Sequence, residues 1–209
     1  MRISDCVGCK TFPCTDVKHE SYVIPGVELA PERISVILIS EAAPADPADH
    51  YYAAGDPLFG QTTVQAFRDA GAEVSSIQDI LALGVYLTPA VKCGKTGYGI
   101  ERATIAECSR LLEQEIALFP NVKVWLLMGD VAIQAVNAIA KRAGEPRVIP
   151  TGPTYKIRGQ AADRPFLFRG ARAFPSYLQA GPSFFIEKSK RRMIAEDIAA
   201  ALRLTRSVF

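Results

Sequence analysis

The sequence predicts an α/β protein, a three-layer α/β/α sandwich with a central, mainly parallel four-stranded sheet. Short apolar runs rich in β-branched residues are typical of buried parallel strands, whereas apolar residues at three- and four-residue intervals are typical of helices. Both patterns occur here, and they alternate along the chain. This alternation favours parallel strands joined by crossover helices. Because 49% of the 209 residues are hydrophobic, the chain can form one substantial core, and we expect a single domain over residues 1–209.

Four segments have the strand pattern. Residues 34–40 form a continuous apolar run with several β-branched side chains, and residues 83–88 and 122–128 share this character. A fourth strand is expected near residues 166–169. These four strands would form the predicted sheet.

Helical periodicity marks the segments between these strands. Residues 62–70 and 104–119 place apolar side chains at helical intervals. Residues 131–142 form a third predicted helix, with Asp130 as its cap and Gly144 as its stop. These helices would cover the two faces of the sheet.

No segment has the character of a membrane span or a secretion signal. The longest apolar runs, such as residues 124–128, are far shorter than the roughly 20 residues needed to cross a bilayer. The N-terminus reads Met-Arg-Ile-Ser-Asp-Cys and lacks an apolar signal core. We therefore expect a soluble, cytoplasmic protein without a membrane partner, and we expect a monomer.

Charge is distributed unevenly along the chain. Residues 1–140 carry 10 Lys and Arg against 17 Asp and Glu, whereas residues 141–209 carry 14 against 5. The basic segment includes a predicted terminal helix over residues 183–204. A basic surface is the electrostatic signature of a nucleic-acid partner. The alternative is that charges from the two segments interleave in the folded protein and cancel.

The five cysteines are an odd number in a chain without an export signal, which argues against a disulfide framework. Metal binding fits them better. Two residues separate Cys6 from Cys9, so both thiolates can face one centre, and Cys93 and Cys108 would complete a set of four. Four thiolates suit zinc or an iron–sulfur cluster.

The spacing favours the cluster over zinc. Zinc ribbons use two closely spaced pairs, whereas 14 residues separate Cys93 from Cys108. The alternative for all of these cysteines is a buried free thiol that packs as a small hydrophobe. That alternative suits Cys14 best, although Cys14 is also a substitute ligand.

The carboxyl ends of the strands are where ligands bind in a parallel α/β sheet. Glu41 directly follows the apolar run 34–40 and is the leading candidate for a functional carboxylate. Its alternative is a solvated loop residue or a helix cap. Asp46 and Asp49 are weaker candidates, and His50 is expected to be exposed in the same loop.

Several motifs together resemble the uracil-DNA glycosylase superfamily, and most closely its iron–sulfur members known as family 4. The resemblance runs from about Cys6 to Leu178 and is strongest in the cysteine pattern with its Lys-Cys pair. The motifs are the Cys6–Cys9 pair, Glu41-Ala-Ala-Pro, Gly55-Asp-Pro-Leu-Phe-Gly60, Tyr86-Leu-Thr-Pro-Ala-Val-Lys-Cys93, Cys108, a Leu-Met-Gly turn and Phe174-Pro-Ser-Tyr-Leu178.

The resemblance implies a DNA-repair enzyme that flips a damaged base out of single- or double-stranded DNA and hydrolyses its N-glycosidic bond. It implies a structural 4Fe-4S cluster on Cys6, Cys9, Cys93 and Cys108, with zinc as the alternative metal. Glu41 matches the family's motif carboxylate, although the motif here has one residue more than the usual Glu-Ala-Pro.

The resemblance also assigns a base-binding pocket, in which this chain departs from the family. Phe59 would stack on the base, one position later than the usual aromatic. Pro89 stands where the family has a base-reading Asn, and Phe174 stands where it has a His. Neither side chain can donate a hydrogen bond, and Ser176 is a candidate substitute.

DNA contacts are implied at two further places. Tyr177 and Leu178 resemble the wedge loop, whose apolar side chain replaces the extruded base in the stack. The alternative for both residues is ordinary packing at a loop end. Basic side chains of the predicted terminal helix would meet phosphates, or would form only a solvated helix face. These residues are Lys188, Lys190, Arg191 and Arg192.

Three functions follow from the sequence. The first is a glycosylase with altered or reduced base specificity, because loss of one donor costs about 100- to 1000-fold in rate. The second is an inactive iron–sulfur protein that binds nucleic acid on the same scaffold. The third lies outside the resemblance: a zinc-stabilised α/β protein that acts on a small ligand at the strand ends.

Overall fold

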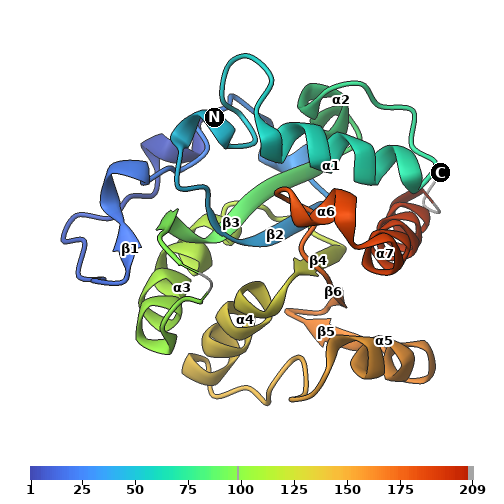
Figure 1. Ribbon diagram of the computed structural model, residues 1–209. Coiled ribbons are helices and arrows are strands. Elements are labelled where there is room, and N and C mark those ends of the chain that lie inside the picture. Colours follow the sequence, from blue (N-terminus) through green and yellow to red (C-terminus); the bar gives the residue numbers. More distant parts are fainter. Residues whose placement is uncertain (98, 207–209) are drawn as a thin grey trace.

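The computed structural model describes residues 1–97 and 99–206. A six-stranded sheet in the order β1-β3-β2-β4-β6-β5 forms its centre (Figure 1). The four inner strands run parallel, which confirms the predicted α/β fold with a mainly parallel sheet. The strands are β1 (Val17–Lys18), β2 (Val36–Ala43), β3 (Val85–Lys95), β4 (Val124–Met128), β5 (Phe166–Phe168) and β6 (Ala171–Ser176).

Helices cover both faces of the sheet and give the predicted three layers. Ile37 and Ile39 of β2 pack into one core cluster together with apolar residues of α3, α4 and α5, and Figure 1 shows α3 and α4 on that side. The alternate residues Val36 and Leu38 pack into a second cluster with α1, α2 and α7. The helices are α1 (Leu58–Asp69), α2 (Ile77–Ala82), α3 (Arg102–Ile116), α4 (Asp130–Arg142), α5 (Thr154–Asp163), α6 (Ser183–Ile186) and α7 (Lys188–Arg206).

The two outer strands, β1 and β5, run antiparallel to their neighbours β3 and β6, and this arrangement was not predicted. The segment expected as the fourth parallel strand, residues 166–169, is instead the edge strand β5, and the fourth parallel strand is β6. A tight hairpin joins them through Arg169 and Gly170, whose φ angles are +49° and +76°. The prediction was wrong because Phe-Leu-Phe has a stronger strand pattern than Ala-Arg-Ala-Phe-Pro-Ser.

β3 extends seven residues beyond the predicted end at Thr88. The extension passes through Pro89, which cannot donate a ladder hydrogen bond. The structure accommodates Pro89 where β3 has only β2 as its neighbour, since β1 pairs only with Gly94 and Lys95. Cys93 therefore lies on a rigid strand and not in a loop.

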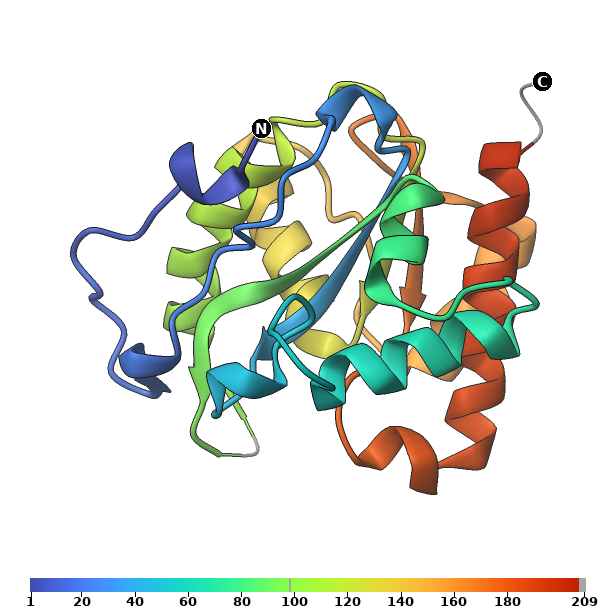
Figure 2. The same cartoon turned by 90° about the horizontal axis from the view of Figure 1, so that it is seen from above.

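The terminal helix and the start of α4 differ from their predictions. The terminal helix breaks at Glu187 into α6 and α7, which Figure 2 shows running in different directions. Asp130 is the first residue of α4, and Gly129 is its cap. Gly144 follows α4 with a φ of +73°, as predicted for a stop. No described helix has the length and apolar character of a membrane-crossing segment.

Candidate functional site

Glu41 lies near the carboxyl end of β2, at the sheet edge where the other parallel strands also end. Its carboxylate lies against the Gly129 backbone, because a Cβ atom on Gly129 would be only 2.6 Å from Glu41 Oε1. Gly129 also has a φ of +100°, which favours glycine. The Lys95 ammonium lies 3.6 Å from Glu41 Oε2, and the Glu41 side chain is 17% exposed. The carboxylate is therefore held in place and still reachable from solvent.

Glu41 lines a cavity of about 280 Å³ at this edge of the sheet. Other walls come from the turn before α4, from the residues at the end of β6 and from α6 and α7. The structure thus brings together five of the predicted site residues: Glu41, Ser176, Tyr177, Leu178 and Lys190. We take this cavity as the candidate active site.

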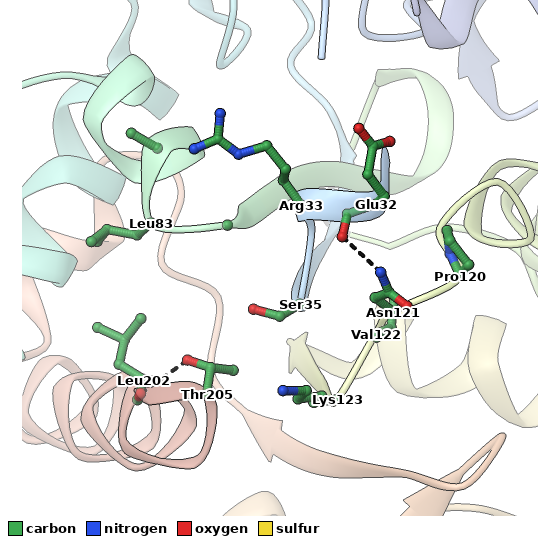
Figure 3. A pocket seen from close by; sticks show the side chains of 12 residues that line it. Glu32, Arg33, Ser35, Leu83, Pro120, Asn121, Val122, Lys123, Leu202 and Thr205 are labelled. Atoms are coloured by element: carbon green, nitrogen blue, oxygen red, sulfur yellow. Dashed lines mark hydrogen bonds between the residues drawn. The ribbon is translucent and has the colours of Figure 1, made fainter. Parts of the chain in front are cut away.

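A larger cavity, of about 870 Å³, lies at the opposite edge of the sheet (Figure 3). Ser35, Gly84 and Lys123 line it, and each directly precedes a parallel strand. Because ligands of parallel α/β sheets bind beyond the carboxyl ends of the strands, its size alone does not make it the functional site.

Phe59 and Pro89 are not among the described residues that line the Glu41 cavity. Phe59 lies in the first turn of α1, half-buried, with its ring centroid 5.4 Å from that of Tyr51. Pro89 is buried and pairs in register with Ser40, next to Glu41. The base-binding roles predicted for Phe59 and Pro89 stay predictions.

Phe174 lines a different cavity, of about 400 Å³, together with Arg158. The guanidinium of Arg172 lies 5.1 Å from the centroid of the Phe174 ring. The structure therefore does not bring Phe174 to Glu41, and its predicted contact with a base stays a prediction.

Ser176 is buried and already uses its hydroxyl hydrogen. Its Oγ donates to Asp197 Oδ2 at 2.5 Å, so it has no proton left for a base carbonyl in this arrangement. Arg158 holds the same carboxylate with three hydrogen bonds of 2.8 to 3.1 Å. Burial raises the pKa of Asp197, and the bonds from Arg158 and Ser176 act in the opposite direction. Sequence reasoning missed this network because it joins three separate elements.

Three of the four basic residues predicted to meet phosphates have acidic partners within the chain. The pairs are Lys190–Glu187, Arg191–Asp69 and Arg192–Glu196. The hydrogen bond from Arg191 to Asp69 raises the pKa of that guanidinium. Part of the basic charge is therefore neutralised, as the interleaving alternative expected, although the Arg192 side chain stays 79% exposed.

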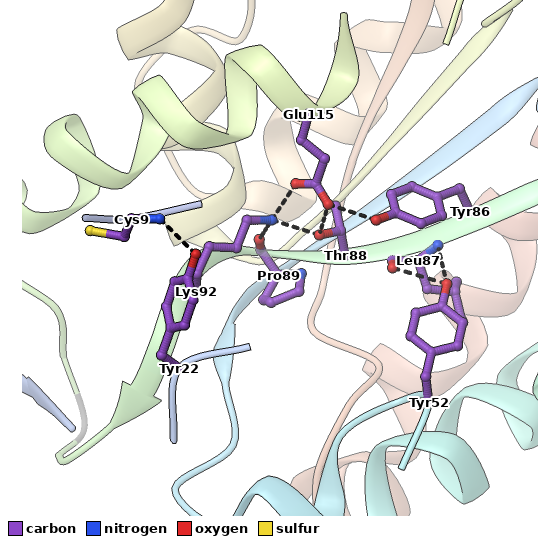
Figure 4. Close-up of polar contacts among 9 residues, drawn as sticks. All are labelled: Cys9, Tyr22, Tyr52, Tyr86, Leu87, Thr88, Pro89, Lys92 and Glu115. Atoms are coloured by element: carbon purple, nitrogen blue, oxygen red, sulfur yellow. Dashed lines mark hydrogen bonds and ion pairs between the residues drawn. The ribbon is translucent and has the colours of Figure 1, made fainter. Parts of the chain in front are cut away.

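A buried ion pair that was not predicted from the sequence joins Lys92 of β3 to Glu115 of α3 (Figure 4). Both side chains are fully buried. Lys92 also donates to Thr88 Oγ1 at 2.6 Å, and Glu115 accepts hydrogen bonds from Tyr86 at 2.6 Å and Thr88 at 2.9 Å. A signal for this pair existed, because Lys92 interrupts a buried strand and Glu115 interrupts the apolar face of its helix.

His50 is buried, which corrects the expectation of an exposed loop residue. Its Nε2 atom has no hydrogen-bond partner among the described residues. Burial lowers the pKa of His50 to about 4, and the charge of Lys92 acts in the same direction. The imidazole is therefore neutral around neutral pH.

Four cysteines line one cavity of about 390 Å³ between the N-terminal segment, β3 and α3. They are Cys9, Cys14, Cys93 and Cys108. Cys6 is exposed and is not among the described residues that line this cavity. Within the described residues, no group of three or more His, Cys, Asp or Glu side chains is arranged to hold a single metal ion.

Comparison with known sequences decides the family. The sequence model described as "Uracil DNA glycosylase superfamily" matches residues 28–196, which is most of the chain. The chain belongs to this superfamily. It is also 35% identical, over 60 residues, to the "Type-5 uracil-DNA glycosylase" of Thermus thermophilus. That alignment covers 29% of this chain and 27% of the relative, so the chain matches about a quarter of the relative's length.

The superfamily match contains all of the described residues that line the candidate active site, from Glu41 to Lys190. It also contains Cys93 and Cys108. The N-terminal cysteines precede the match, so their arrangement has to be judged from the chain itself.

Proposed function

We propose that this superfamily member is a DNA N-glycosylase, which hydrolyses the bond between deoxyribose and a flipped base in single- or double-stranded DNA. The base would be uracil or another deaminated base. The observation that supports this most is the Glu41 carboxylate, fixed at the wall of a cavity that Tyr177 and Leu178 border. The name of the Thermus relative agrees with this reaction class.

Glu41 would act on the sugar. Cleavage develops positive charge on the sugar ring and negative charge on the departing base. A fixed carboxylate stabilises the positive charge and can orient the attacking water. Gly129 supports this role because the absence of a side chain there leaves room for the carboxylate.

The residues beside Glu41 would hold the DNA. Leu178 and Tyr177 would enter the space left by the extruded base, since apolar wedges stabilise an opened stack. Lys190 borders the same cavity, and its ammonium lies 5.5 Å from the Tyr177 ring centroid. Lys188, Lys190, Arg191 and Arg192 would contact phosphates, and the last three would first have to leave their acidic partners Glu187, Asp69 and Glu196.

Base specificity would differ from that of ordinary uracil excision. Pro89 and Phe174 offer no side-chain donor, and Ser176 donates to Asp197. Backbone N–H groups or water would then have to stabilise the negative charge on the leaving base. Each missing donor costs about 100- to 1000-fold in rate, so we propose a slower enzyme or one with a different base.

We also propose a structural 4Fe-4S cluster, which places the chain near the family 4 enzymes. Cys93 and Cys108 would hold it from β3 and α3, and N-terminal cysteines would supply the other thiolates. When bound, the cluster would tie the N-terminal segment to the sheet. Figures 1 and 2 both show this dark blue segment beside α3.

An excision assay tests the proposed activity. Oligonucleotides with uracil, hypoxanthine or xanthine, in single and double strands, are incubated with excess enzyme and cleaved with alkali at abasic sites. We expect release of at least one of these bases, and we expect Glu41→Gln to slow it by about 100-fold or more. Excision that is unchanged in Glu41→Gln would contradict the role of Glu41.

An inactive nucleic-acid-binding protein is the second candidate, and the absence of donors at Pro89 and Phe174 favours it. It predicts DNA binding that weakens steeply with salt, without release of any base. If neither wild-type protein nor Glu41→Gln releases a base while both bind DNA equally, this second function replaces the first.

A further inference from the structure

We infer that the N-terminal ligands of the cluster are Cys9 and Cys14, and that Cys6 is a free thiol. The inference rests on the cluster proposed above and changes the ligand set from Cys6, Cys9, Cys93 and Cys108 to Cys9, Cys14, Cys93 and Cys108. The Cys-x-x-Cys spacing at the N-terminus would then have no role in binding iron.

The positions of the cysteines favour this ligand set. The thiol-bearing residues Cys9, Cys14, Cys93 and Cys108 line a single cavity, and they come from three parts of the chain. Cys93 is buried on β3, and Cys108 is buried on α3. Cys9 and Cys14 are half-buried and close the cavity from the side of the N-terminal segment. All four residues line this one cavity, and the described residues contain no group of three or more such side chains arranged for a single metal ion, which suits a polynuclear cluster better than one zinc ion with Zn–S bonds of about 2.3 Å.

The loop that joins Cys9 to Cys14 also favours this ligand set. Phe12 has a φ of +45°, one of two positive values at non-glycine positions in the described chain, and this left-handed residue turns the loop back. The Phe12 N–H donates to Cys9 Sγ at 3.4 Å, and the Phe12 ring packs edge-on against Tyr22 with centroids 4.9 Å apart. Tyr22 also accepts a hydrogen bond from the Cys9 N–H at 2.8 Å. The loop is therefore held in a shape that lets both of its cysteines line the cavity.

The orientation of Cys6 disfavours it as a ligand. Cys6 directly follows a short 3₁₀ helix, residues Ile3–Asp5, and lies between the buried side chains Ile3 and Val7. Its thiol is directed to the Arg2 carbonyl, at 3.7 Å, within its own turn. Because Ile3 and Val7 anchor this turn in the core, Cys6 is left on the exposed side.

Metal content and visible absorbance test the assignment. The full-length protein and the variants Cys6→Ala and Cys14→Ala are purified without air, and iron and acid-labile sulfide are measured per chain. We expect about four of each, with brown absorbance, in the wild type and in Cys6→Ala. We expect Cys14→Ala to lose most of both. Loss of iron in Cys6→Ala but not in Cys14→Ala would overturn the assignment.

Alkylation of the loaded wild-type protein decides the matter even if a variant fails to fold. Under native conditions, iodoacetamide should modify Cys6 first, because metal-bound thiolates are protected; mass spectrometry locates the modified residue. Modification of Cys14 with Cys6 protected would refute the ligand set. A wild-type protein that contains stoichiometric zinc or no iron would instead refute the cluster, whatever the excision assay shows.

Discussion

Two lysine–glutamate pairs lie three residues apart along β3, and their surroundings differ. Lys92 and Glu115 are fully buried and surrounded by hydrogen-bond partners. Lys95 and Glu41 are 3.6 Å apart at the end of the strand, with side chains 30% and 17% exposed. The same two residue types therefore occur in one network that is enclosed by the protein and in one pair that faces a cavity.

The difference shows what burial does to a charge pair. In a buried pair, each ion has lost its water, so the partner and the surrounding donors and acceptors have to replace it completely. In an exposed pair, water screens the attraction, and the carboxylate keeps room for another ligand. The buried pair Lys92–Glu115 therefore serves stability, whereas the exposed pair leaves Glu41 available for the role proposed above.

The largest expected effect comes from breaking the buried pair. Lys92→Met should lower the free energy of unfolding by about 3–5 kcal/mol, because Glu115 is left as an uncompensated buried charge. Urea denaturation of the purified protein measures this change. The double variant Lys92→Met/Glu115→Leu should recover much of the loss, since it removes both charges. A double variant no more stable than Lys92→Met would show that packing, and not charge, explains the effect.

We expect an effect of intermediate size on the free energy of unfolding at His50, on which the charge of Lys92 acts. Its folded-state pKa of about 4 lies below the ordinary 6.5, so the unfolded chain takes up the proton first as the pH falls. Stability from this residue is complete above pH 6.5 and is lost between pH 6.5 and about 4, up to about 3 kcal/mol in total. His50→Gln should lose less stability over this range in urea denaturation. Equal losses in the two proteins would contradict the burial of a neutral imidazole.

The smallest effect is expected at the exposed pair. Lys95→Ala should change the free energy of unfolding by less than about 1 kcal/mol, because solvent screens the contact with Glu41. Thermal or urea unfolding at low and high salt measures it, and Arg192→Ala provides a matched control at another exposed pair. A loss as large as that of Lys92→Met would mean that the two pairs do not differ as described.

Much of the fold could be predicted from local pattern. The apolar strands β2 and β4 and the helices α3 and α4 follow from periodicity, because residues that repeat at the right interval must share one buried face. β1 and α2 are too short for any period to be recognised. The extension of β3 through Pro89 depends on which side of the strand has a neighbour, and only the assembled sheet decides that.

The candidate site likewise has residues that could be predicted from the sequence and contacts that could not. Glu41 could be predicted because it directly follows the apolar run 34–40, and ligands bind beyond the carboxyl ends of parallel strands. The pairing of Ser176 with Asp197, and of Lys92 with Glu115, joins residues 21 and 23 positions apart through packing between elements. No local pattern specifies such contacts.

By itself, the sequence determined the layered α/β architecture, the edge at which Glu41 lies and the presence of several thiols near one another. Only the tertiary structure decided which cysteines face the shared cavity and which base-reading positions lie away from Glu41. The physical reason is that periodicity fixes the face on which a side chain lies, whereas its neighbours depend on how separate elements pack.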